Sequence, residues 1–154
     1  MRLKFLFPIL AAGFATLAGL PAAGQGKGLF TPVITVNDAV ITRYELEQRM
    51  KFLTILQFPG DIEAEAETGL IEDRLRQQGA KAVGAGVSDE EIQAGMAEFA
   101  GRANLDTEQF LAAIAEGGVE PEAFRDFVSS GMAWRNAVRT RYVGKLTATD
   151  AEVD

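Results

Sequence analysis

The sequence contains no cysteine and no histidine. Without cysteine the fold has no disulfide and depends on the burial of apolar side chains. The two absences together remove the usual zinc and haem ligands, the commonest general base and every Cys–His or Ser–His nucleophile arrangement. We therefore expect no metal, no cofactor and no catalytic residue, since an enzyme would have to work with carboxylates, Lys, Tyr and Ser alone.

Cationic residues are also scarce. The chain has 15 Lys and Arg against 22 Asp and Glu, which is a formal net charge of −7. Proteins that bind nucleic acid need clustered Lys and Arg to contact the phosphates. This balance argues against nucleic acid as a partner.

The first 24 residues carry the clearest pattern in the chain. Arg2 and Lys4 precede an apolar run over residues 5–20, and small residues follow as far as Gly24. This is the three-part layout of a secretory signal peptide, so residues 1–24 are predicted to direct export and to be cleaved. A retained membrane anchor is the alternative, although the run is shorter than the roughly 20 residues that cross a bilayer.

Removal of this leader changes the charge and bounds the architecture. Without Arg2 and Lys4, 13 cations face 22 acids, so the net charge of the exported chain is −9. The remaining length, about 130 residues, suffices for one hydrophobic core. We expect a single domain with no stable membrane insertion after leader removal.

The remaining sequence predicts a mainly α-helical fold with a small N-terminal β-hairpin. Two β-branched runs within residues 33–41 flank Asn37-Asp38, a pair suited to a tight turn. Helix-start patterns and apolar spacing then predict about five helices. These helices are expected over residues 42–57, from 61 to about 84, from 88 to about 104, from 106 or 107 to 116, and from 121 through 142.

The last predicted helix carries large apolar residues on one broad face, together with a cation. Its apolar residues are Phe124, Phe127, Val128, Trp134, Val138 and Tyr142. Arg135 falls near the middle of the same face, so its guanidinium must reach solvent or a carboxylate. Gly131 is expected to let another segment approach closely.

Two stretches then resemble a known family. Residues 37–46 read NDAVITRYEL, and residues 86–92 read GVSDEEI after a long helix. Their order and spacing resemble the N-terminal domain of SurA-type periplasmic chaperones, in the trigger factor/SurA peptide-binding superfamily. On this resemblance, residues 25–146 form a helical chaperone domain, and residues 147–154 begin a linker to a domain absent from this sequence.

The resemblance implies a function. Such a domain binds segments of unfolded outer-membrane proteins, or other extended polypeptides, in the periplasm and without ATP. Family members also carry parvulin-type prolyl isomerase domains, which have no counterpart here, so isomerase activity is not expected. A helix that returns to the N-terminal module is missing as well, so apolar residues are expected to remain exposed.

The expected peptide-binding surface is an open face between the first, third and fifth helices. Its candidate residues are Phe52, Leu56, Met96, Phe99, Met132 and Trp134. Met and aromatic side chains adapt to varied partners, although they are also ordinary core residues. The alternative is an interaction or assembly domain that docks one fixed partner, or a second copy of itself, through the same face.

Overall fold

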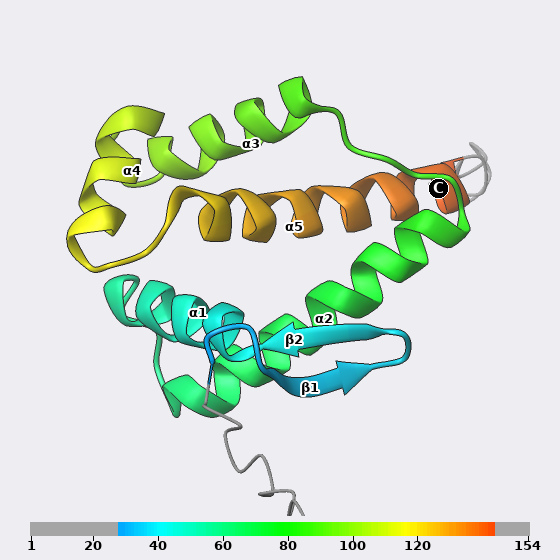
Figure 1. Ribbon diagram of the computed structural model, residues 1–154. Helices are drawn as coiled ribbons and strands as arrows, with labels where there is room; N and C mark the ends of the chain where they lie inside the picture. The colour runs from blue at the N-terminus through cyan, green and yellow to red at the C-terminus, as the bar shows by residue number, and fades with distance from the viewer. Residues whose placement is uncertain (1–27, 144–154) are drawn as a thin grey trace, which may run out of the picture.

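The computed structural model describes residues 28–143. Within this range a two-stranded antiparallel sheet precedes five helices, which confirms the predicted fold class (Figure 1). The elements are β1 (Pro32–Val36), β2 (Ala39–Thr42), α1 (Arg43–Ile55), α2 (Ile62–Ala82), α3 (Asp89–Gly101), α4 (Thr107–Glu116) and α5 (Pro121–Tyr142). The predicted signal peptide, residues 1–24, and the predicted linker, residues 147–154, lie outside the described residues.

Local sequence accounts for where the elements begin. The hairpin turns at Asn37, whose φ of 54° is tolerated by asparagine. Thr42 and Ser88 each cap a helix by accepting a hydrogen bond from the backbone N–H three residues later, and a Glu at that position accepts one in return. Asp61 caps α2, and Pro121 occupies the first turn of α5.

Two helices end earlier than their apolar spacing predicts. Helix α1 ends at Ile55 rather than at Gln57, and α3 ends at Gly101 rather than near Asn104. Gln57 and Asn104 both adopt positive φ values, 54° and 57°. A left-handed residue cannot continue a right-handed helix, so the chain turns away at each of these positions.

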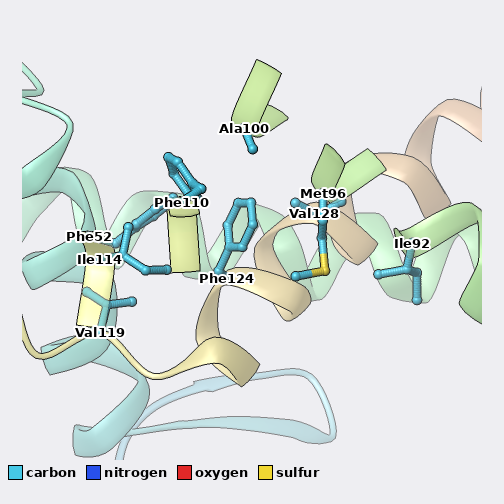
Figure 2. Close-up of a cluster of buried hydrophobic side chains, with 9 residues drawn as sticks. All are labelled: Phe52, Ile92, Met96, Ala100, Phe110, Ile114, Val119, Phe124 and Val128. Atoms are coloured by element: carbon cyan, nitrogen blue, oxygen red, sulfur yellow. The ribbon is translucent and has the colours of Figure 1, made fainter. Parts of the chain in front are cut away.

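Helix α5 runs through the middle of the molecule, with α3 and α4 on one side and α1, α2 and the hairpin on the other (Figure 1). The larger core cluster joins α3, α4 and α5 to Phe52 of α1 (Figure 2). Phe124 has no exposed surface, and its ring centroid lies 4.8 Å from that of Phe110. Burial of a side chain of this size contributes about 1.5–3 kcal/mol.

A second core cluster lies beneath the hairpin, where Ile41 of β2 is fully buried against α1 and α2. Arg74 of α2 holds this region together. Its guanidinium donates to the carbonyl oxygen of Val40 and forms an ion pair with Glu45. Burial by itself would raise the pKa of Glu45, but hydrogen bonds from Thr42 and Arg74 outweigh it and hold that pKa below its usual value.

The broad apolar face predicted for α5 is largely exposed in its C-terminal half. Trp134, Val138 and Tyr142 are 46 %, 38 % and 45 % exposed. The residues that α5 buries here are the small ones, Ser130 and Ala137. Small side chains allow α5 to approach its neighbours closely, so the large apolar residues on the adjoining face are left in solvent.

Candidate functional site

A surface groove of about 210 Å³ lies where α2, α3 and α5 meet. Its apolar lining consists of Phe99 from α3 and Phe127, Val128 and Met132 from α5. Charged side chains from all three helices border it: Asp73, Arg76, Glu98, Arg102 and Arg135. The groove therefore combines an aromatic and sulfur-containing floor with a charged rim, as ligand sites commonly do.

Two glycines give the groove its shape. A Cβ atom on Gly95 of α3 would lie only 2.9 Å from the Val128 Cγ1 atom and closer still to the Met132 sulfur, so α3 and α5 are in close contact here. Gly131 is different, because a Cβ atom there would meet no heavy atom within 4 Å. Gly131 thus leaves open space in the groove, contrary to the expectation that it admits a close neighbouring segment.

The aromatic floor is supported from below. The Phe99 and Phe127 rings meet edge to face, with centroids 5.8 Å apart and an interplanar angle of 86°. Phe52, which is buried, lies under both rings, and its centroid is 5.3 Å from that of Phe127. Edge-to-face packing holds aromatic rings in a defined orientation, so the floor is preorganised.

Most of the charged side chains that line the groove are paired, and one of them, Asp73, is buried beneath its surface. Asp73 accepts from Arg49 at 2.6 Å and from Arg76 at 3.2 Å, and the Arg49 guanidinium also lies 4.9 Å from the Phe127 ring centroid. Arg102 donates to Glu98 at 2.7 Å, and this hydrogen bond lowers the pKa of the Glu98 carboxyl. Arg135 has no carboxylate oxygen within 4.0 Å among residues 28–143.

Comparison with known proteins places this fold. A family model described as the SurA-like N-terminal domain matches residues 1–138. The chain belongs to the SurA-like N-terminal domain family. The match covers both stretches on which the resemblance depends, residues 37–46 and 86–92.

Individual relatives of this SurA-like domain are more distant. Proteins named Chaperone SurA are 29% identical in Nitrosospira multiformis, 28% in Burkholderia orbicola and 25% in Vibrio cholerae, and each alignment covers 99% of this chain. The chain spans only 37% of the length of each of these relatives. No solved structure is a significant match.

The six predicted peptide-binding residues of the SurA-like domain fall into three groups. Phe99 and Met132 line the groove. Phe52 and Met96 are only 2 % and 4 % exposed and belong to the core, so they lie beneath the surface and not on the expected open face. Leu56 and Trp134 are exposed outside the groove lining. Their part in peptide binding stays a prediction.

The sequence-based prediction omitted nine of the eleven residues that line the groove: Asp73, Arg76, Gly95, Glu98, Arg102, Phe127, Val128, Gly131 and Arg135. It also placed the surface against the first helix, whereas the groove is lined by α2, α3 and α5. The apolar spacing of α5 did mark Phe127 as inward-facing. No local pattern distinguishes an inward residue at a groove from one in the core, because the difference depends on how far apart the neighbouring helices lie.

A second, shallower hollow of about 590 Å³ lies between α1, the start of α2 and Gly117, with Met50, Ile55 and Ile62 in its lining. It lacks aromatic residues. The groove, which has an aromatic floor, is therefore the candidate site.

Over residues 28–143 the structure holds no cluster of metal-ligating side chains and no helix long and apolar enough to span a membrane.

Proposed function

We propose that this SurA-like domain is an ATP-independent periplasmic chaperone module that binds segments of unfolded outer-membrane proteins. The observation that carries the proposal is a groove with a preorganised Phe99–Phe127 floor that stays open to solvent in a folded domain. An open apolar surface with no covering side chain favours contact with the apolar segments of another chain. Membership of a family whose relatives are named chaperones supports the same function.

The proposed mechanism is holding. A protein that binds the unfolded state keeps aggregation-prone segments occupied and needs no covalent chemistry to do so. Met132 suits this role because the unbranched thioether adapts to side chains of different shape. The net charge of −9 expected after leader removal helps a complex with a captured client to remain in solution.

The periplasmic location is proposed from the leader pattern of residues 1–24 and from the family resemblance. We also propose that the chain itself has no prolyl isomerase activity. Its match to the relatives is to an N-terminal domain that makes up about a third of their length. The role of this domain is then binding, and its clients would be outer-membrane proteins or other extended polypeptides.

Light scattering tests the proposal. A denatured outer-membrane protein is diluted into buffer with and without the chain, and near-stoichiometric amounts of the chain should suppress aggregation. Gly131→Leu adds a side chain to the groove at a position where a Cβ atom has no neighbour within 4 Å, so this variant should fold and lose most of the suppression. Gly101→Leu is the matched control, because Gly101 also has no neighbour within 4 Å but does not line the groove.

Two results would overturn the proposal. The chain could fail to suppress aggregation at any ratio, which would remove the chaperone function. Alternatively, Gly131→Leu could hold clients as well as Gly101→Leu does, which would remove the groove as the binding site. Circular dichroism of both variants confirms that each is folded.

The exposed stripe on α5 favours a second candidate, docking to one fixed partner or to another copy of the chain. Trp134, Val138 and Tyr142 lie one helical turn apart on the same face and remain in contact with solvent. Sedimentation velocity of the chain and of a Trp134→Ser variant tests self-association. If the chain forms a dimer that Trp134→Ser dissociates, self-association through this stripe is supported. If the chain is a monomer at all concentrations, only docking to a different protein remains of this candidate.

A further inference from the structure

Within the described part of the chain, one guanidinium at the groove makes no ion pair. Asp73 is bound by Arg49 and Arg76, and Glu98 is bound by Arg102. Arg135 borders the same groove, is exposed, and has no carboxylate oxygen within 4.0 Å among residues 28–143. The mouth of the groove therefore carries a surplus positive charge, although the chain as a whole is acidic.

This surplus charge has a defined chemistry. A guanidinium presents donors in a planar fork that matches the two oxygens of a carboxylate. Glu98 leaves this fork unfilled, because its carboxylate accepts a hydrogen bond from Arg102 at 2.7 Å and makes no ion pair with Arg135, whose charge acts on it only from farther away and helps to lower its pKa. A carboxylate from a bound peptide is free to reach Arg135, and it would then lie beside the apolar floor of Phe99, Phe127 and Met132.

We propose that the groove selects extended segments in which a large apolar side chain is flanked by a carboxylate, and that Arg135 binds this carboxylate. The inference rests on the proposed function, since it specifies which client segments the same groove takes. The carboxylate can belong to an Asp or Glu side chain or to the C-terminus of the client. Both sources present the same two oxygens to the guanidinium.

The acidic surface of the chain does not prevent Arg135 from binding a carboxylate that is in direct contact with it. The Debye length at physiological ionic strength is about 8 Å, so charges farther away on the surface are largely screened. Direct contact with Arg135 is screened much less. The acidic surface thus slows the approach of an acidic segment, whereas Arg135 determines how tightly the segment is held once it lies in the groove.

Fluorescence anisotropy of labelled peptides tests the inference. Three peptides share one length and one central Phe, and the flanking residue is Glu, Gln or Lys. A second pair has a neutral flank and ends in either a free carboxylate or an amide, which distinguishes the two sources. We expect the Glu peptide to bind roughly three- to tenfold more tightly than the Gln peptide, with the Lys peptide weakest. The preference should shrink in 1 M salt.

Variants of the chain assign the preference to one side chain. Arg135→Gln should bind the Glu and Gln peptides equally, and Arg135→Lys should keep part of the preference because it retains the charge but loses the fork. Arg141→Gln is the matched control, because Arg141 lies on the same helix but does not line the groove. It should behave like the wild type.

Failure of this inference can be told from failure of the proposed function. Equal binding of the Glu, Gln and Lys peptides, or a preference that survives in Arg135→Gln, would overturn the role of Arg135. If aggregation were still suppressed in that case, the chaperone function would stand. No binding of any peptide together with no suppression of aggregation would overturn both.

Discussion

Arg49 and Asp73 form an ion pair at 2.6 Å that is almost completely removed from solvent, with side chains 9 % and 6 % exposed. The pair joins α1 to α2 next to the groove. Ser130 of α5 donates a hydrogen bond to the Asp73 carbonyl oxygen, and the Arg49 guanidinium lies against the Phe127 ring. Together these contacts connect α1, α2 and α5.

Removal of one member of this pair should destabilise the domain strongly. Asp73→Ala leaves the Arg49 guanidinium buried without its partner, and such a loss costs about 3–5 kcal/mol. Urea denaturation followed by circular dichroism measures the change. The double variant Arg49→Met/Asp73→Leu should recover most of the stability, because no uncompensated charge remains. A single variant that lost under 1 kcal/mol would show that the pair is not needed.

The two groove glycines should respond oppositely to alanine. Gly131→Ala adds a methyl group in open space and removes a flexible residue from a helix, so it should stabilise the domain by up to about 1 kcal/mol. Gly95→Ala has the same propensity gain, but its methyl group overlaps Val128 and Met132. Overpacking costs about 1–3 kcal/mol, so the net loss should reach up to about 2 kcal/mol. Thermal unfolding of both variants checks the opposite signs.

Asp126 should destabilise the domain at neutral pH. Its desolvation and the nearby Glu45 charge raise the Asp126 pKa above the ordinary value of 3.8. A raised acid pKa contributes stability that is complete below the ordinary value and is lost as the pH rises through the folded-state value. Asp126→Asn should therefore increase the urea midpoint at pH 7, and this gain should vanish near pH 3. Partial exposure of the side chain keeps the effect small.

The capping boxes at Thr42 and Ser88 should differ in how much they contribute to stability. Ser88→Ala removes one exposed cap and should cost about 1 kcal/mol. Thr42→Ala should cost more, because the Thr42 hydroxyl also donates to the Glu45 carboxylate, which is paired with Arg74 under the hairpin. Chemical denaturation of both variants tests the order. Equal losses would mean that the Thr42–Glu45–Arg74 contacts add nothing to the cap itself.

The local features of the fold were predictable because each is encoded by neighbouring residues. The turn at Asn37, the caps at Thr42 and Ser88, and Pro121 at the start of α5 all depend on residues no more than a few positions apart. The predicted C-terminal ends of the helices were less accurate than the predicted starts. The apolar spacing continues to Leu56 and predicted a helix to Gln57, but the helix ends at Ile55 because Gln57 adopts a left-handed conformation.

The candidate site was predictable only in part. Phe99 and Met132 were identified from residue type, and both line the groove. Phe52 has the same character but lies in the core, because three aromatic rings from α3 and α5 cover it. Residue type alone does not separate these cases, since the helix that covers a side chain comes from a distant part of the sequence.

The amino-acid sequence by itself determined that this domain is helical with an N-terminal hairpin, that it lacks cysteine and histidine chemistry, and where its helices begin. These properties follow from composition and from interactions between near neighbours. The tertiary structure alone decided that Gly95 brings α3 against α5, that Gly131 leaves a hollow, and that Arg135 borders this hollow with no carboxylate oxygen within 4.0 Å among residues 28–143. Those relationships depend on how helices far apart in the sequence cross, because packing and charge pairing act through space and not along the chain.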